Sequence, residues 1–179
     1  MPSDDITNLY SDKELVQKIK ESSDSAFKLL FTKYYSALIN FCFYRIRNLE
    51  ASKDLVQEIF TKLWISRNNL DPDKSVKSYL YKSILNQIIN FKKHSSSKTL
   101  SLDESISIEE NSNTSNLENQ IDLFSCIEKL PEKLKTVFML SRIEGFKYPE
   151  IAEICEISVK AVEKRMTKAF KILRKALSN

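Results

Sequence analysis

Hydrophobic residues recur at three- and four-residue intervals through the first half of the chain, which is the spacing of α-helices with a buried face. This pattern predicts four helices, over residues 12–20, 24–47, 51–66 and 76–93. Ser11 or Asp12 can cap the first of them, Asp24 or Ser25 starts the second, and Ser75 can cap the fourth. The second helix is hydrophobic on nearly all sides, so we expect it to be the buried central helix.

The second half of the chain begins with two more predicted helices. A short amphipathic segment covers residues 121–130. Pro131 then opens the next helix, over 131–143, at a position where helices accept proline. Gly145 follows and is a natural helix stop.

Beyond Gly145 the pattern predicts a short helix over 149–155, a tight turn, and a long helix capped by Ser158. The turn position that often holds a left-handed Gly is here Glu156, where a side chain costs on the order of 1 kcal/mol. Two helices joined by so short a turn are typical of a helix-turn-helix. The expected packed face of the long helix consists of Val159, Val162, Met166, Ala169 and Leu173.

A polar segment separates the two helical halves. Residues 95–119 include eight Ser and four Asn, carry a net charge of −4 and contain no aromatic residue. Such a segment buries too little apolar surface to offset the entropy of ordering it, so we interpret it as a flexible acidic linker. The alternative is a long surface loop within one domain. The predicted fold class is therefore all-α, with two small helical domains over 11–94 and 120–177.

The composition excludes several classes of function. With one Gly, the chain cannot build a Gly-rich phosphate loop, and one His with three widely spaced Cys argues against a zinc site and a disulfide framework. We therefore expect no metal, no cofactor and no catalytic site. No apolar run reaches the roughly 18 residues of a membrane span, and the polar start of the chain does not read as a secretory signal, so we expect a cytoplasmic protein without direct membrane insertion.

Positive charge gathers on the last predicted helix. Residues 158–179 carry seven cations and one acid, Glu163. Lysines recur along the side opposite the packed face: Lys160, Lys164, Lys168, Lys171 and Lys175. A cationic helix within a helix-turn-helix is the electrostatic pattern expected of a DNA-groove reader, although a charge row alone also fits a solvated face.

Two further polar faces lie in the first half. On the predicted helix over 51–66, four polar residues share one side: Asp54, Gln57, Glu58 and Thr61. Taken alone, this face also fits an ordinary solvated outer surface. On the helix over 76–93, cations and amides form a stripe that could hold phosphates and base edges: Lys82, Asn86, Asn90 and Lys93. Tyr79, Tyr81 and Trp64 could stack on unpaired bases, with packing in the core as the alternative.

Three stretches of the chain resemble one family. DLVQEIFTKLW (54–64) resembles region 2.2 of the extracytoplasmic-function (ECF) sigma factors, the smallest class of the sigma-70 family. SYLYKSILNQIIN (78–90) resembles their promoter-melting and −10-reading helix, with Asn86 at a recurrent Asn position. The stretch 130–166 resembles their region 4, which reads the −35 element. The sequence is also similar in style to a branch common in Bacteroidetes, where membrane anti-sigma proteins often control these factors.

The resemblance implies partners and site residues. The partners would be the β′ clamp and β flap of core RNA polymerase, promoter DNA, and an anti-sigma factor, of which the membrane-anchored kind is common in that branch. The implied polymerase contacts are Asp54, Gln57, Glu58 and Thr61. The implied −10 contacts are Arg67, Asn68, Lys74, Tyr79, Lys82, Asn86, Asn90 and Lys93. The implied −35 contacts are Ser158, Lys160, Ala161, Glu163, Lys164, Thr167, Lys168 and Lys171.

Two rival functions remain at this point. A helix-turn-helix regulator could bind duplex DNA as a dimer without polymerase, but it leaves the polar faces at 54–61 and 82–93 unexplained. An all-helical adaptor that binds only proteins is disfavoured by the cationic final helix. An enzyme is the least favoured class, because the sequence offers no catalytic constellation.

Overall fold

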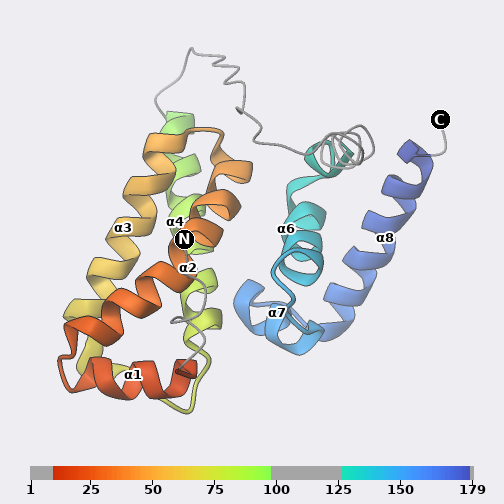
Figure 1. Cartoon of the computed structure of the whole chain (residues 1–179). Helices are drawn as coiled ribbons and strands as arrows, with labels where there is room; N and C mark the ends of the chain where they lie inside the picture. Colours follow the sequence, from red (N-terminus) through yellow and green to blue (C-terminus); the bar gives the residue numbers. More distant parts are fainter. Residues whose placement is uncertain (1–9, 98–125, 178–179) are drawn as a thin grey trace, which may run out of the picture. The chain divides into compact units, whose positions relative to one another are not determined.

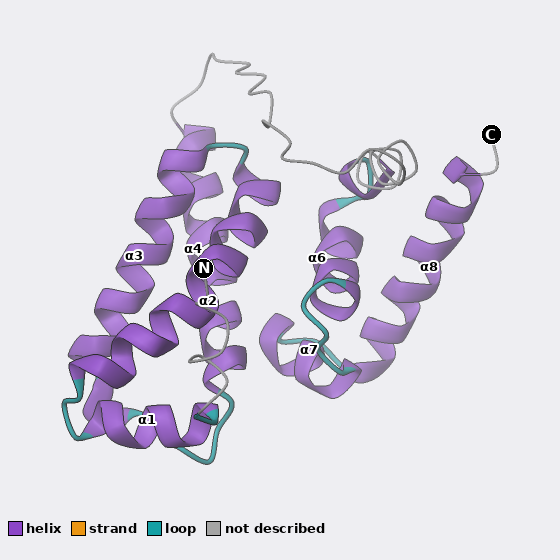
Figure 2. Ribbon diagram, viewed as in Figure 1, coloured by secondary structure: helices purple, strands orange, loops and turns teal. Residues whose placement is uncertain are grey.

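The structure is a computed structural model that describes residues 10–97 and 126–177 (Figures 1 and 2). The chain divides into two compact units, one on each side of the junction between residues 97 and 98. The described parts of both units are helical and contain no strand, which confirms the all-α prediction. Residues 98–119 of the predicted linker lie outside the described residues. Within the two described ranges, no helix is both long and apolar enough to cross a membrane.

The described part of the first unit, residues 10–97, is a bundle of four α-helices and one 3₁₀ turn. These elements are α1 (Asp12–Lys20), α2 (Asp24–Ile46), α3 (Leu49–Ile65), η1 (Arg67–Asn69) and α4 (Val76–Ser97). Helix α2 contacts α1, α3 and α4, as expected for the central helix (Figure 1). Helix α4 continues to Ser97, three residues into the segment predicted as linker.

Large side chains from all four helices fill the interior of this bundle. Leu38 and Phe41 of α2, Phe60 of α3 and Ile84 of α4 are almost fully excluded from solvent. Burying each such side chain contributes about 1.5–3 kcal/mol to folding. This core fixes which faces of α3 and α4 remain available to partners.

Side-chain caps set where the helices begin. Of the two residues that could cap α1, Ser11 is the cap. Its hydroxyl accepts a hydrogen bond from the Glu14 backbone N–H, and the Glu14 carboxylate accepts one from the Ser11 backbone N–H. Ser75 caps α4 as predicted. Helix α2 is capped by Ser23, so Asp24 is its first residue. Helix α3 begins two residues earlier than expected, because Asn48 accepts from the Ala51 backbone N–H at 2.9 Å.

The second unit contains three described helices. They are α6 (Glu132–Arg142), α7 (Tyr148–Cys155) and α8 (Val159–Leu177), and α8 contacts both of the others. Residues 126–128 are also helical, while 121–125 of the predicted amphipathic helix lie outside the described residues. The helix order and boundaries confirm the predicted helix-turn-helix, formed by α7 and α8.

The turn between α7 and α8 is closed by backbone hydrogen bonds. Glu156 adopts the left-handed conformation with φ 53°, at the position predicted from the sequence. The Ile157 N–H donates to the Ala152 carbonyl at 2.9 Å and the Glu156 N–H donates to the Glu153 carbonyl at 3.3 Å. These two bonds form a Schellman motif, which offsets the steric cost of a non-Gly residue there.

One side of α8 packs into the second unit. Val162, Met166, Ala169 and Leu173 are buried, as predicted. The prediction was wrong for Val159, which is 38% exposed. As the first residue of α8, beside the exposed cap Ser158, Val159 lies at the edge of the packed face.

Candidate nucleic-acid interface

The predicted polar face of α3 is a continuous exposed surface. Asp54, Gln57, Glu58 and Thr61 are all exposed, while Val56, Phe60 and Leu63 on the opposite side are buried. The Thr61 hydroxyl donates to the Gln57 carbonyl at 2.9 Å, so its donor is used within the helix. The face therefore presents mainly two carboxylates and one amide to a partner.

Glu58 already has a cationic neighbour. Lys62 Nζ lies 2.5 Å from Glu58 Oε1, one helical turn away. The hydrogen bond from Lys62 lowers the pKa of Glu58, and a hydrogen bond from Gln87 of α4 acts in the same direction. Glu58 thus connects α3 with α4 and stays ionised at neutral pH.

The amide stripe of α4 borders a pocket between α3 and α4. The pocket has a volume of about 270 Å³ and is lined by Ile59, Lys62, Tyr79, Ser83, Asn86, Gln87 and Asn90. The structure therefore brings three predicted −10 residues together: Tyr79, Asn86 and Asn90. Lys82 is half-buried and Lys93 is exposed, and neither is among the described residues that line this pocket.

Three polar residues that line this pocket were not predicted from the sequence: Lys62, Ser83 and Gln87. Ser83, Asn86, Gln87 and Asn90 follow the i, i+3, i+4, i+7 spacing of one helical face, so this signal was available for Ser83 and Gln87. Lys62 belongs to the neighbouring helix, and only the packing of α3 against α4 brings it to this face.

A second pocket lies at the loop that leads into α4. It measures about 210 Å³ and is lined by Val16, Ser66, Asn69, Leu70, Asp71, Lys74, Ser75, Val76 and Tyr79. Tyr79, which is 39% exposed, borders both pockets. Of the predicted loop contacts, Lys74 lines this pocket, whereas Asn68 is exposed and is not among the described residues that line it.

Arg67 packs against the protein. Its Nε donates to the Ser22 hydroxyl at 3.1 Å, and another guanidinium nitrogen donates to the Trp64 carbonyl at 2.9 Å. The guanidinium carbon also lies 4.6 Å from the Trp64 ring centre, within cation–π range. These contacts tie the start of the loop to the α1–α2 turn.

The aromatic residues proposed for base stacking differ in exposure. Tyr81 is 1% exposed and packs edge-on against Phe41 at 5.2 Å, so the stacking prediction was wrong for it and the core-packing alternative is confirmed. Trp64 is half-buried between Arg67 and Phe27. Tyr79 retains an exposed ring surface next to the amide stripe.

The cationic side of α8 faces solvent. The exposed candidates are Ser158, Lys160, Glu163, Lys164, Thr167, Lys168 and Lys171, and Ala161 is half-buried. The Ser158 hydroxyl accepts from the Ala161 backbone N–H at 3.2 Å, so Ser158 acts as the predicted helix cap. The Thr167 hydroxyl donates to the Glu163 carbonyl. The lysines are therefore the side chains best placed to reach phosphates.

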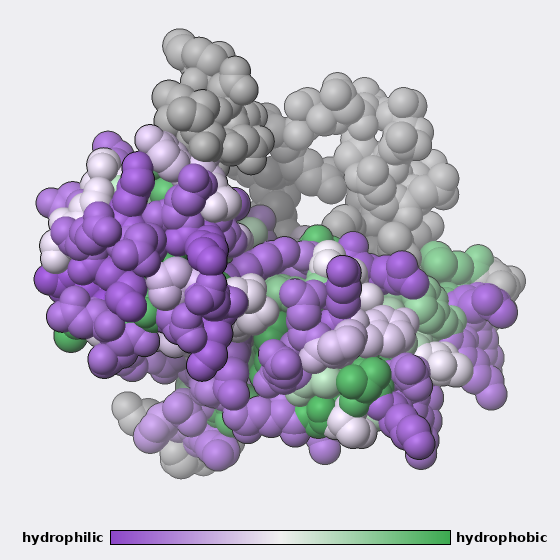
Figure 3. Space-filling view, turned by 90° about the horizontal axis from the view of Figure 1, so that it is seen from below, coloured by the Kyte–Doolittle hydropathy of each residue, from purple (hydrophilic) through white to green (hydrophobic). Residues whose placement is uncertain are grey.

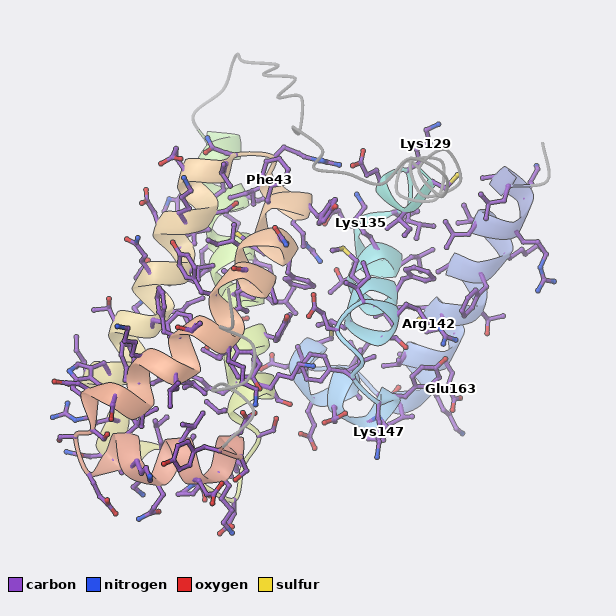
Figure 4. All side chains as sticks on the ribbon, in the orientation of Figure 1. Phe43, Lys129, Lys135, Arg142, Lys147 and Glu163 are labelled. Carbon is purple, nitrogen blue, oxygen red and sulfur yellow. The ribbon has the colours of Figure 1, made fainter. Side chains whose placement is uncertain are left out.

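One aromatic residue interrupts this polar surface. Phe170 is 38% exposed, packs edge-on against Phe138 at 5.7 Å, and lies under the guanidinium of Arg142, which extends from α6 (Figure 4). The second unit also exposes Ile143, Val159, Ile172 and Leu177, and green hydrophobic areas are visible on it in Figure 3. Phe170 was not predicted as a surface residue, although its position between Lys168 and Lys171 in the sequence indicates an aromatic side chain on the cationic helix.

Comparisons with known families match both units. The model of Sigma-70 region 2 matches residues 30–97, and the model of Sigma-70 region 4 matches residues 120–173. Together they match more than half of the chain. The region 2 match accounts for the first unit, which a lone helix-turn-helix regulator leaves unexplained.

Individual relatives agree with this family. The chain is 25% identical to the RNA polymerase sigma-H factor of Pseudomonas aeruginosa, with 93% of each chain covered. It is 26% identical to the ECF RNA polymerase sigma-E factor of Escherichia coli, covering 94% of this chain and 93% of the relative. The fold resembles that of CnrH, solved in complex with the cytosolic domain of CnrY, at 23% identity and a TM-score of 0.70 over 93% of this chain and 97% of that chain. The chain therefore belongs to the sigma-70 family, as an RNA polymerase sigma factor of the ECF subfamily that directs transcription initiation.

Proposed function

We propose that the first unit binds core RNA polymerase through α3 and the opened −10 strand through α4 and its preceding loop, while the second unit binds the −35 duplex through α8. The observation that carries this proposal is the separation of surface chemistry. Helix α3 exposes carboxylates, α4 exposes amides that line the pocket between α3 and α4, and α8 exposes a row of lysines. The role is non-enzymatic and is carried out where RNA polymerase works, in the cytoplasm.

Polymerase binding is assigned to Asp54, Gln57 and Glu58. Their exposed acidic surface fits a basic coiled-coil surface on the polymerase clamp, and charged contacts of this kind set association rate and specificity. Thr61 lies on the same face, but its hydroxyl donor is bonded to Gln57, so it contributes mainly its methyl group and an acceptor.

Recognition of the −10 strand is assigned to the two pockets that meet at Tyr79. Unstacking a base costs a few kcal/mol, and contacts in a pocket with aromatic stacking of about 1–3 kcal/mol per base offset that cost. The loop pocket next to Lys74 is suited to a flipped base. Asn86 and Asn90 offer paired donors and acceptors to the edges of neighbouring bases.

Recognition of the −35 element is assigned to the exposed side of α8. Lys160, Lys164, Lys168 and Lys171 supply point charges for phosphates, which position the helix without reading sequence. Glu163, exposed among them, is the candidate for accepting a hydrogen bond from a cytosine amino group. Ser158 and Ala161 lie at the start of this surface, where a recognition helix approaches the bases.

The polymerase assignment is tested by charge reversal. Asp54→Lys together with Glu58→Lys is expected to abolish retention of the full chain on immobilised core polymerase. Glu21→Lys is the matched control, because Glu21 is an exposed acid of the same unit at the end of α1. Undiminished retention of the double variant removes α3 from the polymerase interface.

An anti-sigma partner is also proposed. The fold relative CnrH was solved in complex with the cytosolic domain of CnrY, and the exposed hydrophobic residues of the second unit supply a surface for a protein partner. Affinity purification of the tagged chain from its own cells should recover one protein that suppresses transcription by the reconstituted holoenzyme. Recovery of polymerase alone contradicts this part of the proposal.

A further inference from the structure

The Glu58 carboxylate joins the two surfaces that are proposed to bind different partners. It belongs to the exposed face assigned to polymerase. It also pairs with Lys62 at 2.5 Å and accepts a hydrogen bond from Gln87. Both of these donors line the pocket between α3 and α4.

Two hydrogen-bond donors of the pocket, Lys62 and Gln87, therefore already interact with Glu58. Lys62 is its one cation among the described lining residues, and its charge is balanced by Glu58. The remaining polar lining residues all lie on one face of α4: Tyr79, Ser83, Asn86 and Asn90. A lysine next to an amide face has the chemistry to hold a backbone phosphate while amides contact base edges.

We infer that Lys62 and Gln87 form an additional subsite for a backbone phosphate of single-stranded DNA, and that Glu58 restrains this subsite until polymerase engages its carboxylate. The inference rests on the proposed function, since it uses the assignment of Glu58 to the polymerase interface. It adds two DNA-contacting residues and a physical link between the two binding events.

The Lys62–Glu58 ion pair is exposed enough for each side chain to exchange its partner for a group of polymerase or DNA. The side chains of Lys62 and Glu58 are 58% and 48% exposed, so either can leave the other without opening the core. An exposed ion pair is weak and is readily replaced by a basic surface on one side and a phosphate on the other. Release of Lys62 is expected to raise affinity for single strands by about two- to fivefold.

The test measures binding of the free full chain to a fluorescein-labelled single-stranded oligonucleotide by anisotropy. Glu58→Gln is expected to bind about two- to fivefold more tightly than wild type, because Lys62 loses its counter-charge. Glu21→Gln removes one exposed acid of the same unit and is the control for net charge. The double variant Glu58→Gln/Lys62→Gln is expected to lose the gain, with a salt slope lower by about 0.7.

Two outcomes overturn the inference. Equal tightening by Glu58→Gln and Glu21→Gln shows a general charge effect without a restraint. Retention of the full gain in the double variant shows that Lys62 does not contact the strand.

Failure of the proposed function is recognised separately. Lys62→Gln is expected to retain polymerase in the pull-down while lowering open-complex formation by the holoenzyme. If the Asp54→Lys/Glu58→Lys variant keeps polymerase, the polymerase assignment fails, whereas the anisotropy result still decides the subsite.

Discussion

Replacement of Arg67 separates a structural role from a DNA contact. The residue was expected to contact the −10 strand, whereas its guanidinium bonds to Ser22 and to the Trp64 carbonyl and stacks on the Trp64 ring. Arg67→Ala removes all three contacts. Arg67→Lys keeps the charge but cannot reproduce the planar fork that makes two directed hydrogen bonds and a stacking contact at once.

The expected magnitude follows from those contacts. Each hydrogen bond contributes about 0.5–1.5 kcal/mol, and a partly exposed cation–π contact about 0.5–1 kcal/mol. Discounting for exposure, Arg67→Ala should lower the free energy of unfolding of the first unit by about 2 kcal/mol, and Arg67→Lys by about 1 kcal/mol.

Urea unfolding followed by tryptophan fluorescence measures this effect directly. Trp64 is the single Trp of the chain, so the signal reports on the first unit alone. With a slope of about 1 kcal/mol per molar urea, the midpoint for Arg67→Ala should fall by about 2 M. A structural role for Arg67 is refuted if both variants unfold at the wild-type midpoint while Arg67→Ala, and not Arg67→Lys, loses affinity for single-stranded DNA. That result would show that Arg67 contacts DNA phosphates instead of stabilising the first unit.

Three further predictions concern the caps, the cationic helix and pH. Ser158→Ala should lower the stability of the second unit by about 1 kcal/mol in thermal unfolding, because it removes the cap of α8. Ser158→Asn should preserve the stability, because Asn also caps helices. Equal losses in the two variants would contradict a capping role. Lys164→Ala with Lys168→Ala should weaken binding to −35 duplex and reduce the salt slope by about 1.8 in anisotropy titrations, and an unchanged slope excludes them as phosphate contacts. Burial, together with the hydrogen bond to Asp12, raises the pKa of Tyr34 above its ordinary value of 10.0, so the folded state holds this proton after the unfolded state has lost it. Wild-type stability should therefore fall more steeply above pH 10 than that of Tyr34→Phe, and parallel pH profiles contradict this assignment.

Local features of the fold were predictable because local chemistry decides them. Ser11, Ser75 and Ser158 can cap helices whatever surrounds them, since the bond runs to a backbone N–H three residues ahead. The left-handed turn at Glu156 followed from helix spacing alone. Asn48 was overlooked as a cap because the hydrophobic pattern of α3 becomes regular only some residues later.

Features that depend on packing between helices were not predictable. Tyr79 and Tyr81 lie two residues apart on α4, yet one is 39% exposed and the other 1%, because Tyr81 meets Phe41 of α2. The same holds for the candidate site. In the sequence, Lys62 has no feature that distinguishes it from other surface lysines of α3. Only the packing of α4 against α3 places it in one pocket with Gln87 and the two asparagines.

One reaction, the initiation of transcription, requires both polymerase binding and promoter recognition by this chain. Transcription in vitro with core polymerase, the purified chain and fragmented genomic DNA, followed by mapping of start sites, tests both assignments at once. The account predicts transcripts that begin downstream of two shared sequence elements at constant spacing, and a loss of these transcripts with Asp54→Lys/Glu58→Lys. Transcripts no more abundant than those of core polymerase alone would contradict it.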